Sequence, residues 1–317
     1  MDGRDERSAP TPDGHGGHNR HEGARDGHGS PEAPMSVDTS AEPHRAAGAP
    51  PARPERLTYR QALARLRLAQ KTVKGAPAYS RFVNRRIGRL LAAGAYVVGL
   101  TPNQVTAISA VFTFGGISLL ALVRPTVPIG VVICLALVLG YAFDAADGQL
   151  ARLRGGGSLA GEWLDHIVDA AKISSLHLAV AVSCYRFSDL GRGSYLLVPL
   201  GYAVINAVAF FGMILNDLLR QRQAARAGLP VSNQPVAVHA PVWRSLAVVP
   251  SDYGLLCLLF ALLGVGGTFG GVFAVGYGVL AAANLLFLLA ALVRWYGTMT
   301  ALAPSAAPAR PGNGSSG

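Results

Sequence analysis

Four aspartates stand at helical spacing within an otherwise apolar stretch of the chain. Asp144 and Asp147 are three residues apart, and Asp165 and Asp169 are four residues apart. Each pair therefore lies on one face of its own helix. An acidic side chain near the centre of a membrane-inserted helix costs about 2.5–3.5 kcal/mol. Four such groups need compensation, and a bound cation is the simplest candidate.

Small residues accompany these acids at the same spacing. Gly148, Ala151 and Gly161 each lie four residues from one of the aspartates. The turn at 154–158 is short and rich in glycine, so the two helices are expected to be antiparallel neighbours whose acidic faces converge. The small residues leave room for a ligand between them. Taken alone, they also fit close helix packing.

The expected chemistry of this cleft is the binding of hard cations and phosphate. Carboxylates that meet in one cleft repel one another unless countercharges separate them. Mg²⁺ and Mn²⁺ prefer oxygen ligands, and two such ions about 3.5–4 Å apart can clamp a diphosphate. Arg152 is suited to a phosphate contact or, equally, to anchoring the helix at the membrane surface. Lys172, three residues after Asp169, is expected to act as a countercharge.

The overall composition indicates a membrane protein. The chain has 317 residues, of which 50% are hydrophobic and 15% charged, with a mean hydropathy of +0.32. Its net charge of +10 is spread between apolar spans rather than gathered in one patch. Anionic lipid headgroups are therefore the expected partner, and nucleic acid is not.

The hydropathy pattern predicts an all-α polytopic membrane protein with six transmembrane helices. About 20 residues cross a hydrocarbon core of about 30 Å. Thr101 and Pro102 mark the start of the first span as N-cap and first helical residue. Ser251 and Asp252 mark the start of the fifth as an N-cap residue and an acid in the first turn. The expected spans are Pro102–Val123, Ile129–Leu150, Leu159–Tyr185, Tyr195–Leu218, Tyr253–Val265 and Val272–Trp295.

A basic, amphipathic segment precedes the first span, at Tyr79–Leu100. Its mixture of arginines and large apolar residues predicts a helix lying on the lipid headgroups, or alternatively a cytosolic lead-in to a longer first span. The distribution of Lys and Arg places both termini in the cytoplasm of a multi-pass cell-membrane protein. On this topology the outer loops carry only Arg124, Arg186 and Arg192.

Three regions are expected along the chain. Residues 1–75 are rich in Gly, Pro, His, Asp and Arg and should form a disordered tail, residues 76–297 the membrane domain, and residues 298–317 a second disordered tail. Cys134, Cys184 and Cys257 lie in apolar segments without metal-ligand spacing. They are expected to be inert, buried thiols.

The complete motif resembles the signature of the CDP-alcohol phosphotransferase family. All eight fixed positions are present with the expected gaps. The wider resemblance, including the Thr-Pro-Asn sequence that begins at Thr101, covers Tyr79 to Trp295. The fixed positions are Asp144, Asp147, Gly148, Ala151, Arg152, Gly161, Asp165 and Asp169.

The resemblance implies a transferase of phospholipid biosynthesis that displaces CMP from a CDP-alcohol. The donor is expected to be CDP-diacylglycerol, and the acceptor an alcohol hydroxyl. By position, Asp144, Asp147 and Asp165 would hold two Mg²⁺ or Mn²⁺ ions, and Asp169 would be the catalytic base and a possible fourth metal ligand. The CDP site would be lined by Gly148, Ala151, Arg152 and Gly161. Members of the family are commonly homodimers.

Two interpretations from other functional classes fit parts of the pattern. Acidic residues inside membrane helices also mark ion pathways, as in an ion-coupled transporter. Such a protein should spread its acids over the membrane depth and break its helices near the midplane, whereas these acids gather near one face. A catalytically silent scaffold of the same fold is the other alternative, although it has no need of all four acids.

Overall fold

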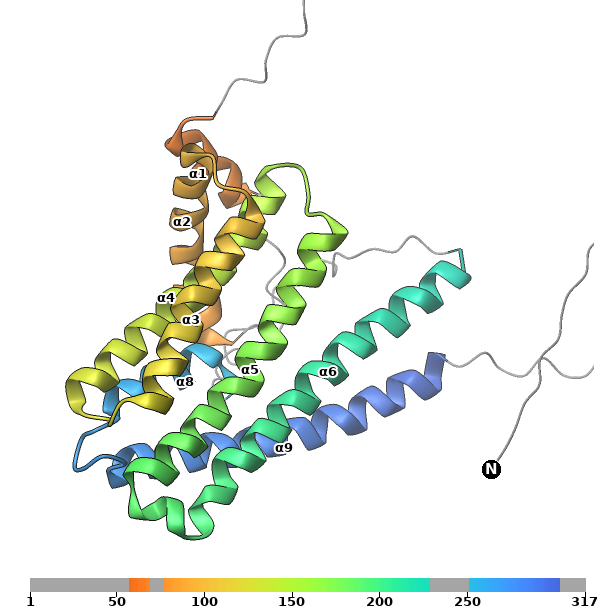
Figure 1. Ribbon diagram of the computed structural model, residues 1–317. Helices are drawn as coiled ribbons and strands as arrows, with labels where there is room; N and C mark the ends of the chain where they lie inside the picture. Colours follow the sequence, from red (N-terminus) through yellow and green to blue (C-terminus); the bar gives the residue numbers. More distant parts are fainter. Residues whose placement is uncertain (1–56, 69–76, 229–250, 303–317) are drawn as a thin grey trace, which may run out of the picture. The chain divides into compact units, whose positions relative to one another are not determined.

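The computed structural model describes residues 57–68, 77–228 and 251–302 (Figure 1), and over these residues it is helical with no β-strand. The predicted all-α class is confirmed. The elements in chain order are α1 (Tyr59–Leu68), η1 (Ser80–Asn84, a π-helix), α2 (Arg85–Val98), α3 (Pro102–Leu122), α4 (Val127–Leu153), α5 (Leu159–Phe187), η2 (Asp189–Arg192), η3 (Ser194–Leu196), α6 (Leu197–Arg226), α8 (Tyr253–Leu259), η5 (Phe260–Leu262) and α9 (Gly271–Leu302).

Five helices in the described residues are long and apolar enough to cross a membrane: α3, α4, α5, α6 and α9. They make the chain a polytopic membrane protein. The expected span at Tyr253–Val265 is a shorter element, with helix only over Tyr253–Leu262. At 1.5 Å per residue this segment is about 15 Å long, roughly half the hydrocarbon thickness.

Local sequence signals define the helix starts. The Thr101 side chain accepts a hydrogen bond from the backbone N–H of Gln104 (3.3 Å), and the Gln104 side chain accepts one from the Thr101 N–H (2.8 Å). With Pro102 in the first turn, this capping box confirms the predicted start of α3. At α8 the N-cap is Asp252 and not Ser251, because the Oδ1 of Asp252 accepts a hydrogen bond of 3.0 Å from the Gly254 backbone N–H.

Helix α1 lies inside the segment that was expected to be a disordered tail, so that expectation is wrong for Tyr59–Leu68. The sequence of α1 is polar on average, but Ala62 and Leu66 are buried in a cluster that includes Ala92 and Leu150. Packing on α2 and α4 therefore stabilises a helix that composition alone does not predict. At the other end α9 continues to Leu302, beyond the expected limit at residue 297. The rest of both tails lies outside the described residues.

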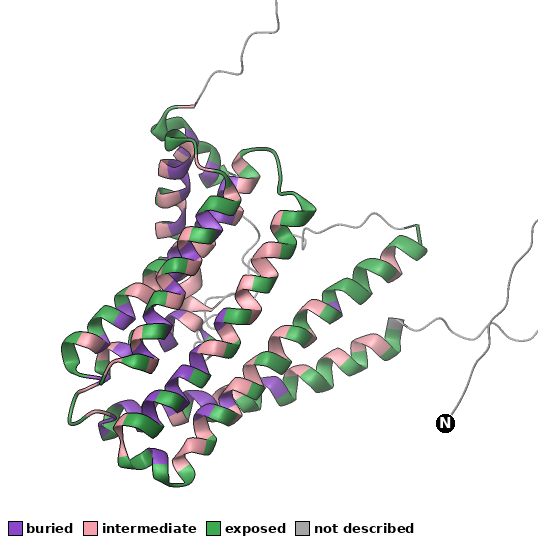
Figure 2. Cartoon of the chain, viewed as in Figure 1, coloured by how far each residue is buried: buried purple, intermediate pink, exposed green. Residues whose placement is uncertain are grey.

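Helix α3 packs against α4 and α5, the two helices that carry the aspartates. Its contacts with each of them are more extensive than the contacts between α4 and α5. Gly140 allows α4 to approach, because a Cβ there would lie 3.1 Å from the backbone nitrogen of Thr113 and 3.2 Å from the carbonyl oxygen of Ser109. Figure 2 shows buried positions on facing sides of α3, α4 and α5, whereas α6 and α9 have largely exposed surfaces away from their contact. The bundle therefore holds α4 and α5 through a shared neighbour.

A buried polar cluster attaches α6 and α9 to α5. The two ring nitrogens of His177 lie 2.6 Å from the Tyr277 hydroxyl and 2.7 Å from Nδ2 of Asn206. The Tyr202 ring stacks on His177 with the ring centroids 4.0 Å apart. Hydrogen bonds of this kind satisfy polar groups inside a membrane bundle and fix the relative position of three helices.

Candidate active site

The structure brings together three of the four predicted aspartates, from α4 and α5. Asp144, Asp165 and Asp169 each present a carboxylate oxygen, and these three oxygens all lie within 4.8 Å of one another. All three side chains are partly buried. The predicted convergence of the acidic faces is therefore present in the fold.

Lys172 bridges two of these three acids, Asp144 and Asp169. Its ammonium group donates hydrogen bonds to Asp144, to Oδ1 of Asp169 at 3.1 Å and to the Ser109 hydroxyl at 3.2 Å. The Lys172 side chain is only 7% exposed. The prediction that Lys172 acts as a countercharge is confirmed, and the charge links α4 to α5.

Asp147 lies outside this group and is held by different partners. Its Oδ2 accepts a hydrogen bond of 2.6 Å from the Thr106 hydroxyl on α3, and its Oδ1 accepts one of 2.5 Å from the Gly148 backbone N–H. The Asp147 side chain is buried. The structure thus holds Asp147 as a separate carboxylate beside the three that converge.

Two polar residues of α3 belong to the site but were not predicted. Thr106 and Ser109 are three residues apart and thus share a helix face, which is directed at Asp147 and Lys172. Both are buried. The available signal was the presence of hydroxyl side chains within an otherwise apolar span, since such groups in a membrane helix generally have a hydrogen-bonding partner.

The predicted small residues and Arg152 differ in their surroundings. A Cβ at Gly148 would meet only Nη1 of Arg152, at 3.5 Å, which leaves space on that face of α4. At Gly161 a Cβ would lie 3.0 Å from Oδ1 of Asn103, so close approach of α3 explains this glycine at least as well as a ligand does. Ala151 is half-buried, and Arg152 is exposed in the last turn of α4.

The donor set fits a divalent cation. Three carboxylates whose oxygens converge offer the oxygen ligands that Mg²⁺ and Mn²⁺ prefer. No histidine or cysteine joins the group among the described residues, which argues against a soft-metal site. All three cysteines are free and buried, as predicted. The acidic cluster can therefore hold a hard metal ion, with Lys172 balancing part of its charge.

With this geometry established, a sequence model of the CDP-alcohol phosphatidyltransferase family matches residues 99–303. The chain belongs to this family. It is accordingly a membrane-embedded transferase of phospholipid biosynthesis, which favours the predicted enzyme over the transporter and the silent scaffold. No curated protein has a matching sequence.

Solved structures of the Mycobacterium tuberculosis phosphatidylinositol phosphate synthase PgsA1 are similar to the chain. The structure in complex with manganese and citrate is 17% identical, covering 68% of this chain and 89% of its own, with a TM-score of 0.40. The structure with CDP-DAG bound is 21% identical, covering 68% of this chain and 94% of its own, also with a TM-score of 0.40.

Proposed function

We propose that this transferase moves a phosphatidyl group from CDP-diacylglycerol to the hydroxyl of an acceptor alcohol. A bond forms between the acceptor oxygen and the phosphorus that carries diacylglycerol. The bond between that phosphorus and the bridging oxygen of the diphosphate breaks, and CMP leaves with the electron pair. The observation that carries the proposal is the convergence of Asp144, Asp165 and Asp169 in a chain of this family.

Asp169 is the proposed general base. It lies on α5, within hydrogen-bonding distance of Lys172 and in the same carboxylate group as Asp144 and Asp165. A carboxylate in this position can take the proton of the acceptor hydroxyl as the new phosphorus–oxygen bond forms. Lys172 orients the Asp169 carboxylate through its 3.1 Å hydrogen bond.

The other aspartates are the proposed metal ligands. Asp144 and Asp165, with Asp169 beside them, would hold Mg²⁺ or Mn²⁺, and Asp147 would contribute to a second ion from its position against Thr106. Bound ions would supply charge neutralisation for the diphosphate and for the leaving CMP. We propose that the CDP site is lined by Gly148, Ala151, Arg152 and Gly161, and that Arg152 binds a phosphate.

Turnover of a defined donor tests this proposal. The purified full chain is incubated in micelles with radiolabelled CDP-diacylglycerol, Mn²⁺ or Mg²⁺, and individual acceptors that carry free hydroxyl groups. CMP release is measured and the lipid product is identified by mass spectrometry. We expect release with at least one acceptor, its loss in EDTA, and its recovery when Mg²⁺ or Mn²⁺ is added back. A chelator-resistant activity would contradict the metal assignment.

Substitution of Asp169 tests the base. Asp169→Asn should reduce kcat by about 10²–10⁴-fold, the usual contribution of a general base. Glu162→Gln is the matched control, because Glu162 is an exposed acid in the first turn of the same helix, and it should keep wild-type turnover. Near wild-type kcat in Asp169→Asn would refute the assigned role.

The proposal also covers the oligomeric state of the protein and its orientation in the membrane. We expect a homodimer in the cell membrane with both termini in the cytoplasm. Light scattering of the purified protein gives the number of chains in each micelle, and a monomer at all concentrations would contradict the first expectation.

A further inference from the structure

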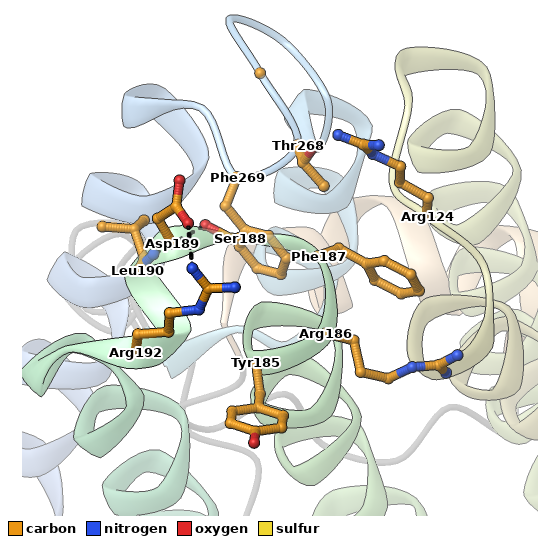
Figure 3. Close-up of a pocket in the computed structure, with 11 residues that line it drawn as sticks. Arg124, Tyr185, Arg186, Phe187, Ser188, Asp189, Leu190, Arg192, Thr268 and Phe269 are labelled. Atoms are coloured by element: carbon orange, nitrogen blue, oxygen red, sulfur yellow. Dashed lines mark hydrogen bonds and ion pairs between the residues drawn. The ribbon is translucent and has the colours of Figure 1, made fainter.

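A cavity of about 660 Å³ opens at the end of the bundle far from the aspartates (Figure 3). Its walls come from the segment after α3, the last turn of α5 with η2, and the loop before α9. Arg186, in the last turn of α5, is about 26 Å along the helix axis from Asp169 at 1.5 Å per residue. The cavity is therefore separate from the active site and lies near the other membrane surface.

Three arginines line this cavity: Arg124, Arg186 and Arg192. On the predicted topology they are the only basic residues of the outer loops, where the positive-inside rule disfavours them. Arg124 precedes α4, Arg186 lies in the last turn of α5, and Arg192 ends η2. Because all three line one cavity, their positive charge is suited to binding an anionic group there.

The existing partners leave much of this charge uncompensated. Nη1 of Arg192 lies 3.3 Å from Oδ1 of Asp189 in an exposed pair, and Arg186 donates a 2.7 Å hydrogen bond to the carbonyl oxygen of Ala121. Arg124 is exposed and has no hydrogen bond or ion pair to another described residue. The residues that line the cavity thus include three arginines and a single carboxylate, that of Asp189.

Aromatic rings accompany the arginines. In Figure 3 the ring of Phe269 lies beside the Asp189–Arg192 pair, whereas the ring of Phe187 lies on the side that carries Arg124 and Arg186. The guanidinium carbon of Arg186 is 4.8 Å from the centroid of the Phe187 ring. Tyr185 lines the same cavity and is exposed. Amphipathic and aromatic side chains at a helix end are typical of the level of the lipid headgroups.

We infer that this cavity binds the phosphate group of an anionic lipid headgroup in the leaflet opposite the active site. Guanidinium groups recognise phosphate oxygens through paired, charge-assisted hydrogen bonds. The aromatic rings would contact the glycerol backbone and upper acyl chains at the membrane surface. The inference is independent of the transferase reaction, since none of the cavity residues belongs to the aspartate site.

Lipid binding to the purified full chain in neutral detergent tests the inference. Native mass spectrometry measures the dissociation constants of short-chain phosphatidylglycerol and phosphatidylcholine. The wild type should bind phosphatidylglycerol about tenfold more tightly than phosphatidylcholine, a difference of about 1.4 kcal/mol. The double variant Arg124→Gln with Arg192→Gln should lose that preference, whereas the control Arg67→Gln, which changes an exposed arginine of α1, should keep it.

Each outcome bears on the inference. A lipid bound at the aspartate site would still bind to both variants, which distinguishes it from a lipid bound in the cavity. Equal binding of the two lipids to the wild type, or an unchanged preference in the double variant, would overturn the assignment. Displacement of phosphatidylglycerol by millimolar inorganic phosphate would support recognition through the phosphate group.

The wild-type protein provides a second measurement that does not depend on variant folding. Phosphatidylglycerol binding at these exposed arginines should weaken as ionic strength rises, because salt screens surface charge. Affinity that is independent of salt would contradict a site built from Arg124, Arg186 and Arg192.

Discussion

Nζ of Lys172 lies 3.1 Å from Oδ1 of Asp169, one turn earlier on α5, and it also donates to Asp144 on α4. A single buried ammonium group therefore joins the acidic faces of two helices that have few direct backbone contacts. In the absence of a metal ion, this charge limits the repulsion between the carboxylates. The following predictions concern this arrangement and the packing that supports it.

Lys172→Met should make the protein more dependent on a divalent cation. Methionine keeps an apolar stem but leaves Asp144 and Asp169 to repel each other. Since both carboxylates are partly exposed, the free energy of unfolding should fall by about 2 kcal/mol. The melting temperature measured in EDTA should fall by about 4–8 °C. Added Mn²⁺ should recover more of the melting temperature in the variant than in the wild type.

The control for this change is Ser175→Ala, on the same helix one turn later, where the hydroxyl donates to two backbone carbonyl oxygens of its own helix, those of Ala171 at 2.6 Å and Lys172 at 3.4 Å. It should change neither the melting temperature nor the response to Mn²⁺. Equal melting temperatures for Lys172→Met and wild type in EDTA would show that the ammonium group has no stabilising role.

Thr106→Val should impair the reaction although Thr106 is not an acid. The substitution removes the 2.6 Å hydrogen bond to Asp147 and leaves a buried carboxylate oxygen without it. A hydrogen bond to a charged group contributes about 1.5–3 kcal/mol. We therefore expect kcat/KM for CMP release to fall by about tenfold or more. Thr106→Ser keeps the hydroxyl and should retain most activity; loss in both variants would point to packing instead.

Gly88→Ala should destabilise the protein. A Cβ at this position would lie 2.9 Å from both the Ala145 Cβ and Nε2 of Gln149, so α2 and α4 must separate. Overpacking of this kind costs about 1–3 kcal/mol. Gly94→Ala, on the same helix, meets no atom within 4 Å and should be neutral or stabilising. Thermal unfolding compares the two, and equal melting temperatures would contradict the close contact.

Two single-cysteine substitutions test the orientation of the chain. All three native cysteines are buried, so an introduced exposed thiol should dominate labelling. Gly157→Cys lies in the turn between α4 and α5, and Gly193→Cys lies between η2 and η3, at the other end of α5. In intact cells a membrane-impermeant maleimide should label Gly193→Cys only. Labelling of Gly157→Cys alone would invert the proposed topology.

The sequence by itself determined the long apolar helices and the acidic residues of the site. Apolar runs, the Thr101 and Pro102 start signal, and the three- and four-residue intervals between aspartates act over one or two helical turns. These local rules are sufficient to predict long helices with acidic faces on α4 and α5. The same reasoning also identified Lys172 as a countercharge, since it shares a helix face with Asp169.

Only the tertiary structure decided which residues of other helices contact these acidic faces. Thr106 is 41 residues from Asp147, and Ser109 is 63 residues from Lys172. Such hydrogen bonds depend on how α3 packs between two other helices, which no periodicity in the sequence encodes. The same holds for polar α1, which is helical because it packs on α2 and α4, and for the convergence of Arg124, Arg186 and Arg192 on one cavity. Local spacing fixes which side chains share a face, whereas packing between distant segments fixes what each face meets.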